Sequence, residues 1–130
     1  MDADILESLI KESEALGFHN FGVTNVPLEL RRDYYNQWIK EGKHGTMAWM
    51  ENNNERRLNP EHLMPEAKSI LVFAMNYYQE APNRNFRIAK YALGKDYHSV
   101  IYKRLKKICR FLKENYQSDQ KPYVDTGPVL

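Results

Sequence analysis

The carboxylate of Asp125 is the side chain whose placement in this sequence most clearly suggests chemistry. It follows the short apolar segment Pro122-Tyr123-Val124 and precedes the turn sequence Thr-Gly-Pro. Sheet proteins often carry site residues at strand ends, and a partly buried carboxyl group there can hold a proton near neutral pH and act as an acid. Many aspartates in such positions instead cap the following turn through a hydrogen bond. The residues alone leave both interpretations open.

A second polar group, Asp96-Tyr97-His98, stands where the last helix is predicted to begin. Asp96 is a suitable N-cap. Because helix N-termini favour negative charge, His98 could help to bind an anionic group there. Capping and packing explain the same residues without a ligand, and on these residues alone we favour capping and packing.

Two adjacent arginines, Arg56 and Arg57, lie in the segment ENNNERRLNP, for which we predict an ordered surface loop. A guanidinium group on such a loop could form paired hydrogen bonds to a carboxylate, an amide oxygen or a phosphate. An isolated surface arginine is more commonly a solvated charge.

The last helix carries many basic residues, namely Lys103, Arg104, Lys106, Lys107, Arg110 and Lys113. Clustered lysine and arginine are sufficient for contacts with a nucleic-acid backbone. A solvated helix face, flanked here by Glu114 and Asp119, is the more common explanation of such a pattern, and we prefer it on the residues alone.

No metal-binding, phosphate-binding or nucleophile motif is recognisable in the sequence. The histidines are scattered at His19, His44, His62 and His98, and none pairs with another at the i, i+4 spacing of helical metal ligands. The single cysteine, Cys109, cannot form an intrachain disulfide, which favours a reducing cytoplasm. We therefore predict no metal ligands in this chain.

Hydrophobic periodicity predicts an α+β fold in which a mixed sheet is covered by amphipathic helices. Helices are predicted at 3–16, at 27–42 and after Asp96, with a helical turn at 46–50, and strands at 20–25, 69–78, 88–98 and 121–125. The strand at 69–78 is apolar enough to be covered on both faces. The strand at 121–125 is expected to lie inside the sheet.

The composition is that of an ordinary globular protein. The 130 residues are 42% hydrophobic and 28% charged, with a formal net charge of +2, which does not by itself indicate a partner. The N-terminus lacks a signal-peptide pattern, and the longest apolar run is too short to span a bilayer. We expect a single domain over residues 1–130 that is soluble, cytoplasmic and not associated with membranes.

Several segments, taken together and in order, resemble the epoxyqueuosine reductase family. They are FHNFGVT, HGTMAWM, RRLNPEHLMPEAKSI, YALGKDYHSVIYKRLKK and YVDTGPVL. The most specific feature is YALGKDYH followed at this distance by VDTGP. The resemblance runs from about Gly17 to Leu130.

The resemblance implies an oxidoreductase that acts in the last step of queuosine synthesis, reducing an epoxide on the modified wobble base of certain tRNAs to an alkene. It implies cobalamin and two 4Fe–4S clusters as cofactors. In this family the N-terminal region supplies much of the cobalamin-binding domain, and a ferredoxin-like region after it supplies the cluster cysteines. We therefore expect an incomplete cobalamin-binding domain, inactive alone, from a monomeric enzyme that continues after Leu130, with an electron donor that the resemblance does not identify.

The resemblance also assigns roles to three positions. Asp125 matches the proposed proton donor, which also lies against the cofactor, Arg57 matches an arginine that contacts the corrin, and Ala89 matches a position that lies against cobalamin through its backbone. An acid is needed because expelling an epoxide oxygen as water leaves negative charge on that oxygen. A tRNA substrate makes phosphate contacts by the basic helix as plausible as a solvated face.

Two other functions remain as alternatives. One is a related corrinoid-dependent reductase of a small molecule, which would lack a basic surface the size of a tRNA. The other is a non-enzymatic RNA-binding module, which would bind tRNA tightly and with strong salt dependence in the absence of a corrinoid.

Overall fold

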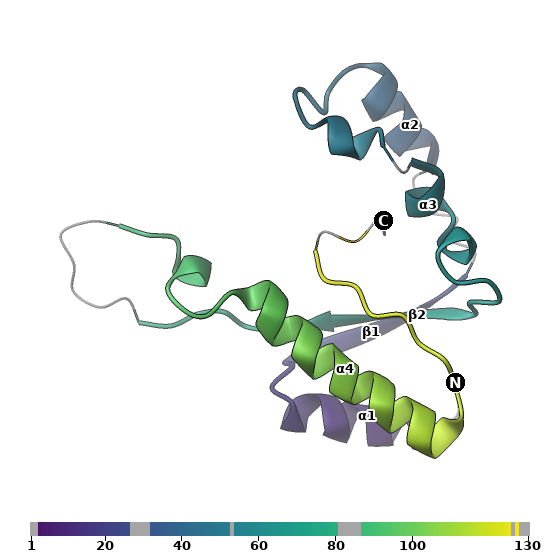
Figure 1. The fold of residues 1–130 in the computed structure, drawn as a ribbon, viewed down its shortest axis with the longest axis vertical. Helices are drawn as coiled ribbons and strands as arrows, with labels where there is room; N and C mark the ends of the chain where they lie inside the picture. The colour runs from purple at the N-terminus through teal and green to yellow at the C-terminus, as the bar shows by residue number, and fades with distance from the viewer. Residues whose placement is uncertain (1–2, 27–31, 53, 81–86, 126, 128–130) are drawn as a thin grey trace. The chain divides into compact units, whose positions relative to one another are not determined.

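The computed structural model describes residues 3–26, 32–52, 54–80, 87–125 and 127. Its elements, in chain order, are α1 (Ala3–Ala15), β1 (Asn20–Asn25), α2 (Arg32–Lys40), the 3₁₀ helix η1 (Ala48–Met50), α3 (Asn54–Leu58), the 3₁₀ helix η2 (Pro60–His62), β2 (Ser69–Ala74), the 3₁₀ helix η3 (Lys90–Ala92) and α4 (Tyr97–Tyr116) (Figure 1). Helices combined with a small sheet confirm the α+β class at this coarse level.

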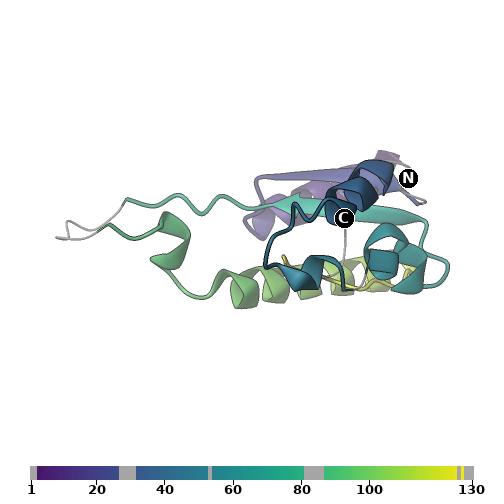
Figure 2. The same ribbon diagram turned by 90° about the horizontal axis from the view of Figure 1, so that it is seen from above.

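The sheet consists of two strands, β1 and β2, drawn as adjacent arrows in Figure 2. Beyond its ends, His19 N donates to Ala74 O at 2.9 Å and Val26 N donates to Lys68 O at 3.2 Å, so the strands run antiparallel. The prediction for β1 is confirmed at both ends. β2 stops at residue 74 rather than 78, and the prediction that both of its faces are covered is wrong, since Val72 is 58% exposed.

Two other predicted strands are also wrong. Residues 121–124 are irregular and Asp125 lies in a turn, so no third strand enters the sheet in the part of the chain that is described. In the segment 88–98, Ala92 N donates to Ala89 O at 2.9 Å and closes the 3₁₀ turn η3. Apolar alternation over a few residues does not distinguish a strand from a turn without a pairing partner.

The chain divides into two compact units, Met1–Gly22 with Val72–Asp125, and Val23–Leu71 with Thr126–Leu130. In the first unit α1 and α4 lie side by side (Figure 1). Its core is formed by apolar residues that are at most 6% exposed, namely Leu9, Phe18, Ile108 and Leu112. Burial of each such side chain contributes roughly 1.5–3 kcal/mol, so these few contacts hold α4 against α1.

α1 ends one residue before its predicted end at residue 16, and Gly17 follows shortly after it. Its φ of +79° is in the left-handed region that favours glycine, and Phe18 N donates to Ser13 O at 3.0 Å across the helix end. A Cβ atom at Gly17 would lie 2.6 Å from Arg104 Nη1 of α4. Glycine is therefore favoured by the backbone conformation, whereas the Arg104 contact involves the end of a flexible side chain that can move.

In the second unit, Tyr35 of α2 and Leu58 of α3 are buried. Tyr35 OH donates to Met50 O at 2.5 Å, and Arg32 Nη2 donates to Leu58 O at 2.9 Å. Residues 54–58 form a helix, so the predicted loop is wrong there. Burial of Leu58 stabilises this five-residue helix, which the preceding run of asparagines does not indicate.

The other two helical predictions in this unit agree with the structure where it describes them. η1 lies within the predicted helical turn at 46–50. The helix predicted at 27–42 is confirmed over 32–40, whereas 27–31 lie outside the described residues. Gly42, with a φ of +67°, follows the helix end.

Candidate active site

Asp125 occupies a turn and has a φ of +41°, an uncommon backbone conformation that aspartate tolerates better than most residues. Its side chain is 59% exposed. Two side chains from the start of α4 contact its Oδ2 atom: Tyr97 OH donates to it at 2.5 Å, and His98 Nε2 lies 3.4 Å away. A carboxylate held in this way has a fixed orientation and is open to a substrate.

The hydrogen bond between Tyr97 and Asp125 changes the acidity of the phenol. Because the Asp125 carboxylate accepts this bond, the pKa of Tyr97 is raised to about 12, with burial contributing in the same direction. Tyr97 therefore remains protonated at neutral pH and acts as a donor that positions Asp125.

Asp96 is the N-cap of α4, as predicted. Its carboxylate accepts hydrogen bonds from the backbone amides of His98 and Ser99, both at 3.2 Å, and from the Ser99 hydroxyl at 2.8 Å. It also lies 3.0 Å from His98 Nδ1. The hydrogen bonds from Ser99, and then those from His98, lower the pKa of Asp96 to about 2, so it is ionised at neutral pH.

An exposed row of aromatic rings adjoins this group. Tyr91 contacts Tyr97 edge to face at 6.0 Å between ring centroids, and contacts Tyr77 in the same way at 6.4 Å. Tyr91 is 54% exposed and Tyr77 is 63% exposed. Edge-to-face pairs favour a fixed ring geometry, and exposed aromatic surface of this kind is typical of binding sites.

Of the three predicted site residues, Asp125 and Ala89 belong to the first unit. Ala89 is exposed, precedes η3 and has an extended backbone with φ −57° and ψ 134°. Arg57 belongs to the second unit, on α3, where its guanidinium carbon lies 6.0 Å from the centroid of the Tyr35 ring. The prediction that these residues share one cofactor site stays a prediction.

The partners of Asp125 were not predicted from the sequence. The sequence favours capping and packing for Tyr97 and His98. A histidine and a tyrosine directly after the N-cap are the available signal, but Tyr97 and Asp125 are 28 residues apart. Only the fold reveals that they meet.

The basic residues of α4 are mostly exposed, namely Lys103, Lys106, Lys107, Arg110 and Lys113. Arg104 is an exception to the predicted basic face. Its Nη1 atom lies 2.9 Å from Met75 Sδ and 3.4 Å from Gly17 O, so it packs within the first unit. We call Lys103, Lys106, Lys107 and Arg110 the basic face of α4.

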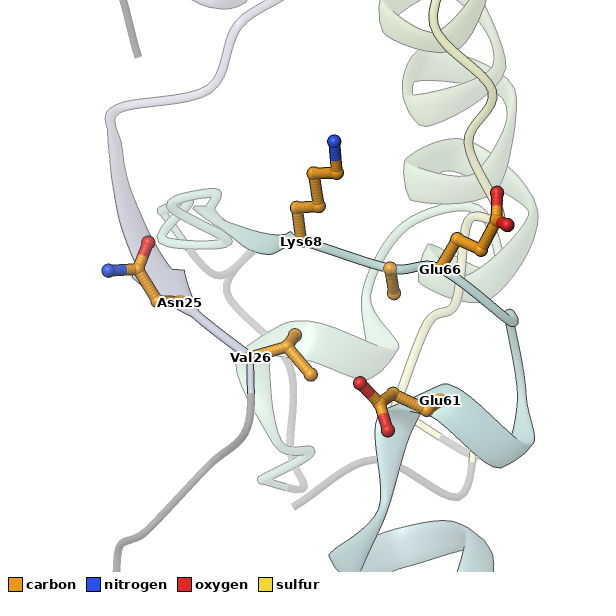
Figure 3. Close-up of a pocket in the computed structure, with 6 residues that line it drawn as sticks. Asn25, Val26, Glu61, Glu66 and Lys68 are labelled. Carbon is orange, nitrogen blue, oxygen red and sulfur yellow. The ribbon is translucent and has the colours of Figure 1, made fainter.

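An open depression in the second unit is lined by Asn25, Val26, Glu61, Glu66, Ala67 and Lys68 (Figure 3). It contains none of the predicted site residues. Within the described ranges there is no group of three or more His, Cys, Asp or Glu side chains that could hold a metal ion. None of the helices there is both long and apolar enough to cross a membrane.

Comparison with known proteins identifies relatives of this chain. The family model described as "Epoxyqueuosine reductase QueG, DUF1730" matches residues 57–126. An epoxyqueuosine reductase of Cellulophaga algicola is 37% identical over 127 residues, which cover 94% of this chain and 42% of that protein. One from Leadbetterella byssophila is 38% identical over 119 residues, covering 88% of this chain and 39% of that protein.

Solved structures show the same fold. A crystal structure of epoxyqueuosine reductase with an epoxyqueuosine-modified tRNA-Tyr stem loop aligns with a TM-score of 0.83 and 27% identity, over 98% of this chain and 36% of that one. An epoxyqueuosine reductase from Streptococcus thermophilus aligns with a TM-score of 0.85 and 23% identity, over the same shares.

The chain thus spans about two fifths of the length of the curated relatives it matches. The matched model covers residues 57–126, which include the N-cap of α4 and Asp125. The resemblance predicted from the sequence is confirmed: this chain belongs to the epoxyqueuosine reductase family.

Proposed function

We propose that this chain is the N-terminal, cobalamin-binding part of an epoxyqueuosine reductase, an oxidoreductase that converts epoxyqueuosine to queuosine at the wobble position of tRNA. The observation that carries this proposal is the short hydrogen bond from Tyr97 OH to Asp125 Oδ2, in a chain of this family. It fixes a carboxyl group at an exposed position, as an acid acting on a bulky substrate requires.

Asp125 is the proposed acid. The reaction expels the epoxide oxygen as water, and the negative charge that develops on this oxygen must be neutralised by a proton donor within hydrogen-bond reach. Tyr97 and His98 both contact Oδ2. When Asp125 is protonated, its proton therefore resides on Oδ1, because Oδ2 already accepts the hydrogen bond from Tyr97.

The residues next to Ala89 fit a corrin. A corrin is a large, flat and mainly apolar ring, and the surface beside Ala89 carries exposed apolar side chains: Ile88 is 41% exposed, and Tyr91 and Tyr77 more so. The small side chain of Ala89 would let the ring approach the backbone. Cobalamin, when bound, supplies the electrons that reduce the epoxide, while the chain binds, orients and protonates.

We also propose that Arg57 contacts the corrin. Its guanidinium group lies over the Tyr35 ring, and Tyr35 in turn is held by its hydrogen bond to Met50 O. A planar guanidinium group held against an aromatic ring is well suited to bind the amide oxygens at the edge of a corrin.

The proposed partner is the tRNA substrate. A structural relative at 27% identity is an epoxyqueuosine reductase with a modified tRNA stem loop, which supports tRNA binding by this protein. The basic face of α4 offers four exposed cations for backbone phosphates. We further propose that two 4Fe–4S clusters belong to the full-length protein and that it works as a cytoplasmic monomer.

The direct test is an assay of the full-length protein with tRNA that carries epoxyqueuosine. We expect formation of queuosine in the tRNA only when cobalamin and a low-potential reductant are both present. Equal reduction of a small epoxide and of the tRNA would favour the small-molecule reductase instead. Tight tRNA binding without any reduction would favour the RNA-binding module.

A further inference from the structure

His98 lies between two carboxylates contributed by different parts of the first unit. Nδ1 is 3.0 Å from Asp96 Oδ1, and Nε2 is 3.4 Å from Asp125 Oδ2. The second distance is within ion-pair range but is too long for a well-aligned hydrogen bond, and the Nε2 atom is shielded from solvent. The titratable groups that face the ring among the described residues are Asp96, Asp125 and Tyr97, whose ring stacks on it at 4.0 Å.

The Asp96 contact determines which ring nitrogen carries a hydrogen. Asp96 has a pKa of about 2, so near neutral pH its carboxylate is ionised and can only accept hydrogen bonds. Nδ1 therefore carries a hydrogen, as it does in other histidines that are oriented by a carboxylate. This leaves Nε2 as the atom that can gain or lose a proton.

A hydrogen on Nε2 would point towards Asp125 Oδ2. Without one, the lone pair of Nε2 would face a carboxylate oxygen, which is a repulsive arrangement. Tyr97 contacts the same Oδ2 atom but, with a pKa of about 12, does not release its proton near neutral pH. Imidazole, by contrast, ordinarily exchanges a proton between about pH 5 and 8.

The proposed reaction needs two protons. Conversion of an epoxide to an alkene and water consumes two electrons and two protons, and Asp125 carries only one transferable proton. After its first transfer Asp125 is an anion, and its Oδ2 atom is 3.4 Å from His98 Nε2. A donor at this place could restore the acid before the hydroxide leaves as water.

We propose that His98 is the second proton donor of the reaction and that it acts through Asp125. Asp125 first transfers its Oδ1 proton to the epoxide oxygen. The Nε2–H bond of His98 then breaks and the proton moves to Oδ2. The carboxyl group then turns about its Cβ–Cγ bond, with Tyr97 donating to the other oxygen, and delivers this second proton to the hydroxide, which leaves as water. His98 is left neutral, with its Nδ1–H still donated to Asp96. Between turnovers the exposed Asp125 carboxylate takes a proton from solvent and passes it back to Nε2. This inference rests on the function proposed above.

A spectroscopic test does not depend on turnover. In full-length protein free of cofactors and labelled with ¹³C at histidine Cε1, the His98 signal is followed by NMR from pH 5 to 9. Asp125→Asn removes a carboxyl group that, when ionised, favours the imidazolium form, so the midpoint of the His98 signal change should move to lower pH. Asp119→Asn is the control, because Asp119 pairs with Lys113 at 3.5 Å and should leave the His98 midpoint unchanged. An unchanged midpoint in Asp125→Asn would overturn the proposal.

A kinetic test separates the relay from a structural role. His98→Gln and His98→Asn retain amide hydrogen-bond donors but have no transferable proton. In single turnover of the loaded enzyme, both variants should slow formation of the alkene by about 10²-fold and remove the dependence of the rate on pH between 5 and 8. Wild-type rates and pH dependence in both variants would overturn the relay. If Asp125→Asn is slow at the same time, the proposed function stands without the relay.

Discussion

Asp96 connects the local sequence to both structure and chemistry, because one carboxylate caps α4 and orients His98. The ionised Asp96 carboxylate accepts hydrogen bonds from two backbone amides at the start of α4. The first amides of a helix have no acceptor within the helix, so these bonds satisfy them. The same negative charge lies where the helix dipole favours it. The site at Asp125 therefore depends on a capping interaction that the sequence itself indicates.

The Asp96 cap should make the stability of the protein depend on acid pH. The pKa of Asp96 is lowered from 3.8 to about 2 in the folded state, so its contribution to the free energy of unfolding is fully present above about pH 4 and is lost as the pH falls towards 2. Asp96→Asn keeps a capping oxygen but does not titrate in this range. Urea unfolding from pH 2 to 6 should show a shallower decline in stability for Asp96→Asn than for the wild type. If stability falls equally steeply with pH in the two proteins, other groups cause the acid sensitivity.

Gly17 offers a second test at the scale of one residue. Gly17→Ala places a Cβ atom 2.6 Å from Arg104 Nη1 and forces alanine to a φ of +79°, so the free energy of unfolding should fall by about 1–2 kcal/mol. Gly22→Ala is the matched control, since no atom lies within 4 Å of its Cβ position and its φ is not in the left-handed region. Equal stability of the two variants in thermal unfolding would contradict the left-handed conformation of Gly17.

At the scale of elements, α4 presents two different surfaces. Its buried side contains Ile108 and Leu112, and its exposed side contains the basic face. Gln117, in a left-handed conformation with a φ of +49°, follows its last residue. This amphipathic pattern places cations on the outside without weakening the core.

The basic face of α4 should contribute to tRNA affinity in a way that salt reveals. Replacing Lys103, Lys106, Lys107 and Arg110 by glutamine in the full-length enzyme should weaken tRNA binding. The slope of log affinity against log salt should flatten by up to about 1 for each phosphate that is no longer neutralised by a cation. Lys11→Gln is a control, because Lys11 is exposed on α1 and pairs with Glu7 at 2.8 Å. A salt slope equal to that of the wild type would mean that this face is only solvated.

The elements differ in how well the sequence predicts them, and the reasons are physical. α1, β1 and the start of α4 follow from periodicity and caps, which are properties of adjacent residues. α3 is too short for periodicity to indicate it, and the segment before Asp125 has strand-forming residues but no neighbouring strand. The residues around Asp125 are enough to identify it as a candidate site residue, whereas its contact with Tyr97 depends on the tertiary fold.

At the scale of the whole molecule, the 130-residue chain should bind no iron–sulfur cluster. A 4Fe–4S cluster is generally held by four cysteine thiolates, and this chain has one cysteine, Cys109, whose burial raises the pKa of its thiol. We therefore expect the purified chain to show neither stoichiometric iron nor the absorption of a cluster after anaerobic reconstitution. A stoichiometric cluster on this chain would contradict the assignment of the cluster ligands to another region of the protein.

The most direct test of the account is Asp125→Asn in the full-length enzyme, because the central claim is that Asp125 donates a proton to the epoxide oxygen. The amide keeps the size of the side chain but cannot deliver a proton. Thermal stability, bound cobalamin and single-turnover reduction of epoxyqueuosine in tRNA are measured on one preparation. We predict that cobalamin remains bound and that the single-turnover rate falls by about 10²- to 10⁴-fold. A variant that is less stable but converts the epoxide at the wild-type rate would contradict this account. Asp125 would then have only a structural role as a cap of its turn.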